Sequence, residues 1–357
     1  MVHYFIVNPK SGKKHKVNVL DDVILPAVKK AGITYEIHET TGPGDATRFT
    51  REVAEKAQKK GEKIRIYSVG GDGTLYEVVN GAIGFDNVEI TVVPTGSGND
   101  YIRIYGGDEL FRNVENLING TPVQVDCLKL TDQDGREEIA LNQASMGFDA
   151  EACSMQGSMK KLPGAMGHLT YTLGGLYCMF TKLYFRYKVT LDGKEIPGPF
   201  IQVTDFIGQY YGSGILGGRF ADPTDGLADV VVIHRCMSWP IVFVYMLFHW
   251  QQKFDFYKYS YCDYLRGKKL TIASEKPIAL NVDGECRPVT KCDFEVVPKA
   301  FTFVIPSDST YLSDVASGKI SHVIDQGPDC QEPRKSKLNN RHLFEHIVNR
   351  GIYGYRR

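Results

Sequence analysis

Three glycine-containing loops each follow a short apolar segment, and their residues are suited to binding phosphate. The loops lie at residues 8–12, 70–74 and 94–100. Glycine removes the side chain, so backbone N–H groups can approach an anion, and a helix that starts there adds partial positive charge. One such loop is equally compatible with an ordinary turn. Three at one edge of a parallel sheet favour a phosphate site, because ligands bind outside the carboxyl ends of such strands.

An aspartate stands inside the second loop, which reads Gly-Gly-Asp-Gly-Thr at residues 70–74. A carboxylate among phosphate-binding amides can hold Mg²⁺, which prefers oxygen ligands and bridges phosphates. The alternative is that Asp72 only caps a helix expected from Leu75. The loop is neither a Walker A motif, which ends in Gly-Lys-Ser or Gly-Lys-Thr, nor a G-x-G-x-x-G motif.

Two further acidic segments lie in the second half of the chain. Residues 222–227 read Asp-Pro-Thr-Asp-Gly-Leu, and residues 283–285 read Asp-Gly-Glu. Both are also common turn sequences. From the residues alone, the first is either a metal-binding loop or a plain turn. The second is either part of an active site or a hairpin with an exposed Glu285.

The first 125 residues alternate between strand and helix patterns, which predicts a parallel sheet with helices on both faces. Asp45 is the expected N-cap of the second helix. The expected strands lie at residues 4–7, 35–38, 64–69 and 90–93, and the expected helices at residues 17–31 and 45–60 and from residue 75 onward.

From residue 126 onward the pattern changes to short strands separated by hairpin signals, which predicts a mostly antiparallel β-sandwich over residues 126–306. Hairpins are expected at the Asp-Gly pairs at residues 134, 192 and 283. The expected strands lie at residues 125–130, 138–143, 187–191, 200–204, 229–234, 269–273 and 301–305, and helical stretches at residues 164–182 and 238–253. Residues 307–357 form a polar extension.

The composition excludes several classes of protein. The 42 basic and 42 acidic residues give no net charge, so the basic excess of a nucleic-acid-binding protein is missing and no nucleic-acid partner is expected. Eight cysteines without C-x-x-C spacing indicate neither a zinc site nor a disulfide framework, and they fit a reducing compartment. Without a signal-peptide pattern or an apolar run of about 20 residues, the chain is expected to be cytoplasmic.

The end of the chain is basic, because residues 334–357 hold seven Lys or Arg and one Glu. The rest of the chain is therefore acidic overall. A basic segment attracts anionic lipid, so this end is either a membrane contact or a solvated tail. The stretches at residues 164–182 and 238–253 are alternative lipid contacts or packed core helices.

In order and spacing, the three loops resemble the diacylglycerol kinase catalytic domain. They read Asn-Pro-Lys-Ser-Gly, Gly-Gly-Asp-Gly-Thr and Pro-Thr-Gly-Ser-Gly-Asn-Asp. This family includes bacterial soluble lipid kinases, sphingosine kinases and ceramide kinases, and the resemblance covers residues 1–306. It implies an ATP-binding domain over residues 1–125, a lipid-acceptor domain over residues 126–306, and ATP and Mg²⁺ as cofactors. The implied reaction transfers the ATP γ-phosphoryl group to a lipid hydroxyl, with diacylglycerol or a related lipid as the acceptor.

The resemblance also implies roles for individual residues. The residues that would hold ATP are Asn8, Pro9, Lys10, Ser11, Gly12, Thr40, Gly70, Gly71, Asp72, Gly73, Thr74 and Ser97. Asp72 would also be catalytic, and with Asp100 and Asp126 it would position the catalytic Mg²⁺. The residues of a second magnesium loop would be Asp222, Asp225 and, through its carbonyl, Leu227. Glu285 would be the general base for the lipid hydroxyl, provided that the second domain folds over the crevice.

Other functions remain open at this point. Residues 208–214 read Gly-Gln-Tyr-Tyr-Gly-Ser-Gly where many members have Asn before three glycines, so the acceptor lipid is open. NAD kinases share the second loop, and a non-catalytic lipid- or nucleotide-binding regulator could share the fold. The first loop together with Glu285 argues against an NAD kinase, and the retained acidic residues argue against a regulator. The expected partner is a lipid at the membrane surface. Peripheral membrane contact and a homodimer are both compatible with the sequence.

Overall fold

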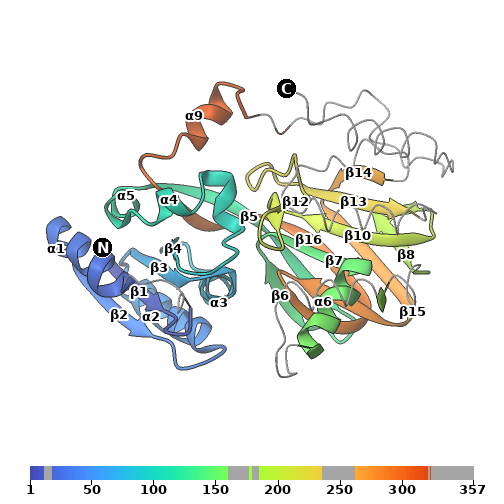
Figure 1. Cartoon of the computed structure of the whole chain (residues 1–357), viewed down its shortest axis with the longest axis horizontal. Coiled ribbons are helices and arrows are strands. Elements are labelled where there is room, and N and C mark those ends of the chain that lie inside the picture. The colour runs from blue at the N-terminus through green and yellow to red at the C-terminus, as the bar shows by residue number, and fades with distance from the viewer. Residues whose placement is uncertain (12–17, 160–176, 179–184, 235–261, 321, 323–357) are drawn as a thin grey trace, which may run out of the picture.

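The computed structural model of the chain describes residues 1–11, 18–159, 177–178, 185–234, 262–320 and 322 (Figure 1). Of the predicted helical stretch at residues 164–182, only residues 177–178 are described, and they are helical. The predicted stretch at residues 238–253 and the basic segment at residues 334–357 lie outside the described residues. Among the described helices, none combines the length and the apolar character that crossing a bilayer requires.

Four parallel strands form the N-terminal part of the sheet, in the spatial order β4, β3, β1 and β2. Their bounds are Val2–Val7 for β1, Tyr35–Glu39 for β2, Ile64–Gly70 for β3 and Val88–Pro94 for β4. Every residue of β3 and β4 is buried, so both faces of the sheet are covered, as the sequence predicts. The loops that follow β1, β3 and β4 therefore lie at one edge of the sheet.

Short helices connect these strands. They are η1 (Val19–Ile24), α1 (Leu25–Ala31), α2 (Asp45–Lys60), α3 (Asp72–Ala82), η2 (Tyr101–Tyr105), α4 (Asp108–Phe111) and α5 (Val114–Ile118). Two helices begin differently from the prediction. Gly44 rather than Asp45 is the N-cap of α2. The helix expected from Leu75 begins at Asp72, because Gly71 takes the extended conformation of an N-cap.

The C-terminal part is mostly antiparallel, as predicted, and lies beside the N-terminal part in Figure 1. Its strands are β5 (Thr121–Asp132), β6 (Glu137–Ala140), β7 (Gln143–Gly147), β8 (Lys188–Leu191), β9 (Lys194–Ile196), β10 (Phe200–Phe206), β11 (Tyr210–Tyr211), β12 (Ile215–Leu216), β13 (Ala228–His234), β14 (Cys262–Gly267), β15 (Lys269–Val282) and β16 (Glu285–Ile305). Its helix α6 (Phe148–Met159) precedes the predicted helical stretch, and α9 (Tyr311–Ala316) follows β16. The predicted domain boundary between residues 125 and 126 falls within β5 and stays a prediction.

One expected strand is divided in two. The sequence predicts a strand at residues 138–143, but β6 ends at Ala140 and β7 begins at Gln143. The chain bends between them because the backbone N–H groups of Leu141, Asn142 and Gln143 all turn toward one carboxylate, that of Asp283. The bend therefore serves the site described below.

Strand β16 joins the two parts of the molecule. Its first half pairs with β15, and near its end Thr302 and Phe303 pair in parallel with β4 of the N-terminal sheet. Two hydrophobic cores lie on either side of this connection. One contains residues of the C-terminal strands, including β7, β10, β13 and β15, and the other contains the N-terminal strands together with the end of β16. Apolar burial thus stabilises each part separately.

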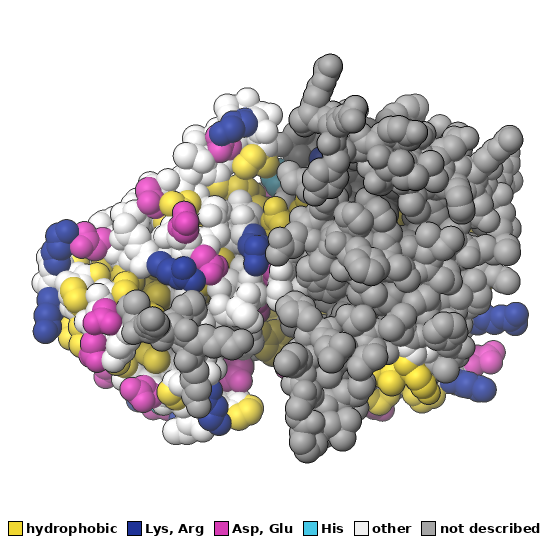
Figure 2. Space-filling model, viewed as in Figure 1, with side chains coloured by type: hydrophobic (Ala, Val, Ile, Leu, Met, Phe, Trp, Pro, Cys, Tyr) yellow, Lys and Arg dark blue, Asp and Glu magenta, His cyan; other side chains and the backbone are white. Residues whose placement is uncertain are grey.

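The described side chains on the face shown in Figure 2 carry both signs of charge. Over the N-terminal part, Lys and Arg are interspersed with Asp and Glu rather than gathered into a patch of one sign. Such a surface favours solubility more than attraction to one kind of charged polymer.

The second and third loops touch through two glycines. A Cβ atom on Gly96 would lie 2.5 Å from the Cα atom of Gly71 and 2.8 Å from Oδ1 of Asn99. Because the nearer obstacle is backbone, the two loops would have to separate to admit a methyl group. In contrast, a Cβ atom on Gly73 would meet no atom within 4 Å.

We expect Gly96→Ala to lower the free energy of unfolding by about 2 kcal/mol, because overpacking displaces the loop backbone. Gly73→Ala is the matched control and should unfold at the same urea concentration as the wild type. Urea unfolding followed by circular dichroism measures both variants. Equal stability of Gly96→Ala and the wild type would show that the loops do not make this contact.

Candidate active site

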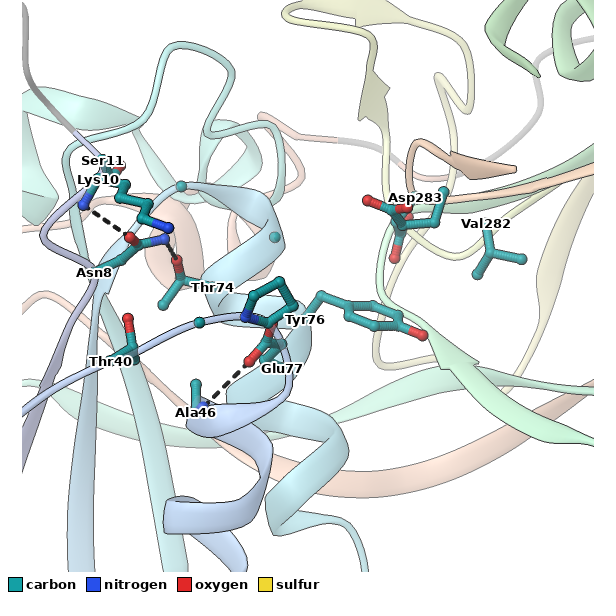
Figure 3. Close-up of a pocket in the computed structure, with 15 residues that line it drawn as sticks. Asn8, Lys10, Ser11, Thr40, Ala46, Thr74, Tyr76, Glu77, Val282 and Asp283 are labelled. Atoms are coloured by element: carbon teal, nitrogen blue, oxygen red, sulfur yellow. Dashed lines mark hydrogen bonds between the residues drawn. The ribbon is translucent and has the colours of Figure 1, made fainter. Parts of the chain in front are cut away.

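A cleft of about 660 Å³ lies between the carboxyl edge of the parallel strands and the turn that joins β15 to β16 (Figure 3). Residues from both parts of the chain form its walls. They are Asn8, Lys10, Ser11, Thr40, Gly42, Pro43, Ala46, Gly71, Gly73, Thr74, Tyr76, Glu77, Val282, Asp283 and Glu285. The second part therefore does fold over the loops, which was the condition for a role of Glu285.

Side-chain hydrogen bonds hold the three loops together. Asn8 Nδ2 donates to Thr74 Oγ1 at 3.1 Å, and the N–H of Lys10 donates to Asn8 Oδ1 at 3.0 Å. Thr95 Oγ1 donates to Ser11 Oγ at 2.9 Å, which joins the third loop to the first. Short polar side chains therefore fix the loops, and the backbone N–H groups at the start of α3 remain available to an anion.

The start of α2 forms a second rim of the cleft. Glu77 of α3 accepts hydrogen bonds from the N–H groups of Gly44, at 3.0 Å, and Ala46, at 3.2 Å. Asp45, the predicted N-cap, instead accepts the N–H of Thr41 at 2.9 Å, because it lies inside the first turn of α2. These contacts fix the loop that carries Thr40, Gly42 and Pro43 along the cleft.

Asp72 lies half-buried in the first turn of α3 and points toward the third loop. Its Oδ1 accepts the N–H of Asp100 at 2.8 Å. Burial, and next the nearby carboxylate of Asp100, raise the pKa of Asp72 to about 6. Burial also raises the pKa of Asp100, although Arg103 pairs with it at 3.1 Å. The fold thus holds two carboxylates near each other at a cost that a cation would offset.

The turn between β15 and β16 presents two carboxyl groups. Asp283 and Gly284 both have positive φ, 47° and 99°, which is the geometry of a two-residue type I′ hairpin. Asp283 accepts the N–H groups of Leu141 at 2.6 Å, Asn142 at 3.0 Å and Gln143 at 2.9 Å. Glu285 pairs with Val282 across the turn and is exposed on the wall of the cleft.

Asp283 also lies in surroundings that disfavour its negative charge. Burial raises the pKa of Asp283 to about 6, with a further contribution from Asp100, although the three N–H groups act in the opposite direction. Asp283 in turn contributes to the raised pKa of Asp72. Asp100 thus acts on both Asp72 and Asp283, and Asp283 acts on Asp72.

The loop predicted to bind a second magnesium ion is a compact turn. Asp222 Oδ1 accepts the N–H of Thr224 at 3.0 Å, and Asp225 Oδ1 accepts the N–H of Leu227 at 2.9 Å. Burial raises the pKa of Asp225, and Asp222 adds to this shift. Arg266 lies 3.6 Å from Asp225 Oδ2. The two carboxylates are therefore close enough to influence each other, which fits a site for a hard cation.

Asp126 is placed beside this loop. Its Oδ2 accepts the N–H of Gly226 at 2.7 Å, and its Oδ1 accepts the N–H of Lys299 at 2.8 Å. Its own N–H donates to the carbonyl of Pro223 at 2.7 Å. Both carboxyl oxygens of Asp126 are therefore engaged by backbone groups around the loop.

The part of the chain that the structure describes contains no cluster of three His, Cys, Asp or Glu side chains that could hold a metal ion by themselves. This arrangement still fits Mg²⁺, which usually takes one or two carboxylates and completes its shell with water and substrate phosphates. Asp72 is suited to this role because burial and the nearby carboxylate of Asp100 disfavour its negative charge, and no cationic side chain in the described part of the chain pairs with it.

Not every residue that is predicted to bind ATP lines the cleft. The five predicted residues missing from its walls are Pro9, Gly12, Gly70, Asp72 and Ser97. Gly12 lies outside the described residues, and Ser97 is exposed. Gly70 supports the site differently, because a Cβ atom there would lie 2.3 Å from Thr74 Oγ1.

Several cleft residues are absent from the sequence prediction. Tyr76 and Glu77 follow the glycine loop directly, and they face the cleft because α3 begins at Asp72. The Tyr76 hydroxyl donates to Glu138 Oε2 of β6 at 3.3 Å, across the two parts of the chain. Asp283 was visible in the Asp-Gly-Glu segment, but its partners are distant in sequence.

Comparison with known proteins places the chain among lipid kinases. Residues 3–140 match the family described as the diacylglycerol kinase catalytic domain, and residues 142–305 match the YegS C-terminal NAD kinase beta sandwich-like domain. The chain belongs to the diacylglycerol kinase catalytic-domain family, a family of lipid kinases.

Relatives with this architecture match most of the chain. A Shewanella frigidimarina protein named "Probable lipid kinase YegS-like" is 26% identical over 85% of this chain and 94% of its own. The diacylglycerol kinase of Bacillus subtilis is 25% identical over 87% of this chain and 98% of its own. The crystal structure of a diacylglycerol kinase from Bacillus anthracis has the same fold, with a TM-score of 0.61 at 21% identity over 85% of this chain and 96% of that chain.

We expect Asp72→Asn to stabilise the protein without added metal by about 1–3 kcal/mol near pH 7.5, because it removes a buried charge. The folded-state pKa of about 6 exceeds the ordinary value of 3.8, so ionised Asp72 opposes folding above about pH 6. The gain should shrink as the pH falls from about 6 toward 4. Urea unfolding at several pH values measures it.

The exposed Asp86→Asn provides the control for a simple loss of negative charge and should change stability little at any pH. A gain for Asp72→Asn that is independent of pH, or no gain at about pH 7.5, would contradict the assignment of an uncompensated charge to Asp72.

Proposed function

We propose that the protein is an ATP- and Mg²⁺-dependent lipid kinase, which transfers the γ-phosphoryl group of ATP to the hydroxyl of diacylglycerol or a related lipid. The observation that carries the proposal is that one cleft is lined both by the glycine-containing loops at residues 8–12 and 70–74 and by the exposed carboxylate of Glu285. Phosphoryl transfer to an alcohol requires a held phosphate donor, neutralised charge and a base for the hydroxyl proton.

The first wall has the properties of a triphosphate site. The start of α3 offers backbone N–H groups and the positive end of an 11-residue helix. Lys10 lines the same wall and supplies a mobile positive charge that is suited to phosphate. Thr40 and the rim at Gly42, Pro43 and Ala46 lie beside these groups, where the nucleoside would lie.

The acidic groups of the cleft support a requirement for Mg²⁺. Burial raises the pKa values of Asp72, Asp100 and Asp283, and repulsion from Asp100 adds to the shifts of Asp72 and Asp283. Asp72 would hold the ion together with water and the ATP phosphates, and the ion would spread the charge that develops during transfer. Asp222, Asp225 and the carbonyl of Leu227 would hold a second ion with a structural role.

Glu285 is the proposed general base. Its side chain is exposed in the cleft, and the type I′ turn that precedes it is fixed by the three hydrogen bonds of Asp283. A lipid hydroxyl between Glu285 and the phosphate loops would lose its proton to Glu285 as its oxygen attacks phosphorus. Positioning of these groups, rather than covalent catalysis, would supply most of the rate.

The class of acceptor rests on the relatives, whose printed names refer to lipid kinases and diacylglycerol kinases. Apart from residues 177–178, the segments predicted to contact lipid lie outside the described residues. The structure therefore contributes the donor site and the base to this proposal, and the family contributes the lipid.

Purified protein incubated with Mg²⁺, labelled ATP and a panel of diacylglycerol, ceramide, sphingosine and NAD tests the proposal. We expect a labelled phospholipid from diacylglycerol or a related lipid, and Glu285→Gln should lower its formation by about 100-fold or more. Glu275→Gln, an exposed position on β15 away from the cleft, is the matched control and should retain wild-type turnover.

Label that appears only in NAD phosphate would overturn the lipid kinase proposal in favour of an NAD kinase. No labelled product from any acceptor, with ATP still bound, would favour a non-catalytic regulator. Near-wild-type turnover of Glu285→Gln would exclude Glu285 as the base.

A second variant tests the donor site. Gly73 lines the cleft, and a methyl group there meets no protein atom, so Gly73→Ala should fold normally. We expect its affinity for ATP to fall about tenfold, equivalent to about 1.4 kcal/mol, because the methyl group keeps phosphate away from the N–H groups of α3. Calorimetric titration with ATP and Mg²⁺ measures this. Unchanged affinity would place the phosphates elsewhere.

A further inference from the structure

Two cysteines lie beside the proposed catalytic base. Cys153 lies on α6, and Cys286 directly follows Glu285 on β16. Both are partly exposed. The other cysteines among the described residues are buried, namely Cys127, Cys178, Cys262 and Cys292. The pair is thus distinguished by its exposure as well as by its position.

The Cys153 thiol contacts the turn that leads to Cys286. Cys153 Sγ donates to the carbonyl oxygen of Gly284 at 3.5 Å. Gly284 lies two residues before Cys286, so this contact places the Cys153 thiol beside Cys286. The neighbouring Cys153 side chain, and next burial, raise the pKa of Cys286. Cys286 is therefore kept as a protonated thiol, with a second sulfur as its neighbour.

Helix α6 is fixed against the same hairpin by further contacts. Asp149 Oδ2 accepts Asn281 Nδ2 at 3.1 Å, and Glu151 Oε1 accepts the N–H of Ala279 at 3.1 Å. Asn281 Oδ1 in turn accepts the N–H of Gly284 at 2.9 Å. Asp149, Glu151 and Cys153 of α6 thus all bond to β15 or to the turn that follows it. The proximity of the thiols is thus imposed by the surrounding frame.

We propose that Cys153 and Cys286 are a site of reversible oxidation, at which a low-molecular-weight disulfide converts the two thiols into a disulfide bond and lowers phosphoryl transfer by displacing Glu285. The part that concerns turnover rests on the proposed function of Glu285. The formation of the bond does not.

The chemistry balances with glutathione disulfide as the oxidant. The Cys153 thiolate attacks one sulfur of glutathione disulfide, forms a mixed disulfide and releases one glutathione thiolate. Cys286 then gives its proton to solvent and attacks the Cys153 sulfur, which releases the second glutathione thiolate. Two protein thiols are oxidised, one glutathione disulfide is reduced, and the two released thiolates take up the two protons. Cys153 attacks first because the raised pKa of Cys286 keeps that thiol protonated.

The bond would act on Glu285 through the backbone. A disulfide brings two sulfur atoms to about 2.05 Å, closer than any hydrogen-bonded contact, and it removes the proton that Cys153 donates to Gly284. Both changes act on the residues directly before and after Glu285. Since transfer depends on the position of the base to within about 1 Å, a small displacement is enough to slow it.

The bond itself is tested without any substrate. The protein is equilibrated in mixtures of reduced and oxidised glutathione, blocked with an alkylating reagent and mapped by mass spectrometry under non-reducing conditions. Cys236 and Cys330, which lie outside the described residues, are first replaced by serine so that they cannot exchange. We expect a peptide pair linked through Cys153 and Cys286, which reductant removes. The absence of this linked pair in fully oxidised, folded protein would overturn the proposal.

Turnover is then measured with the reduced and oxidised forms of the same protein. We expect oxidation to lower turnover at least tenfold and dithiothreitol to restore it. Cys153→Ser, whose hydroxyl can still donate to Gly284, should keep the reduced rate under both conditions. A mapped disulfide with unchanged turnover would overturn the link to Glu285. A protein without kinase activity under reducing conditions would instead refute the proposed function, while the linked peptide still reports on the pair.

Discussion

The carboxylate of Asp283 is the contact on which the geometry of the cleft depends. It binds three successive backbone N–H groups, of Leu141, Asn142 and Gln143, at the point where β6 gives way to β7. The side chain of Leu141 belongs to the N-terminal core, whereas Gln143 begins a strand of the C-terminal part. One side chain therefore fixes the β15–β16 turn to the junction of the two parts. The direction of Glu285 into the cleft follows from this anchor.

Asp283 also adds to the energetic cost of holding several carboxylates close together in the folded protein. Asp283 and Asp100 raise the pKa of Asp72, and Asp100 raises that of Asp283. In the described part of the site only Asp100 has a short ion pair, with Arg103. A fold selected for stability alone would not place such groups together. Their retention is understandable if a cation shares the cleft during function, because it turns mutual repulsion into attraction. These carboxylates would then lower the free energy of unfolding of the free protein and, in return, raise its affinity for ATP with a bound metal ion.

The fold class and the position of the three loops at one edge of the sheet are predictable from sequence because their signals are local. Each phosphate-type loop is one continuous segment after a buried strand, and parallel strands bring such segments to one edge. The contacts of Asp283 illustrate what cannot be predicted from the sequence. Its partners lie about 140 residues earlier in the chain, and a continuous strand is the simpler interpretation of residues 138–143. Helix α6 escapes prediction because its apolar residues do not form one stripe, so the usual periodicity is weak.

Strand β16 explains how the proposed base and the proposed donor site keep a fixed relative position although separate cores stabilise them. The strand begins at Glu285 and ends in parallel pairing with β4, whose carboxyl end leads into the third loop. Between these points its pairing with β5 shifts between Val297 and Phe301, and Lys299 there has a φ of 53°. Asp126 binds the N–H of Lys299 with one oxygen and that of Gly226 with the other. The bend that lets one strand pair in both parts of the sheet is therefore joined to the predicted second metal loop. A cation bound at Asp222 and Asp225 would stiffen this connection, so its contribution to catalysis would come through the alignment of the two walls rather than through contact with the reacting groups.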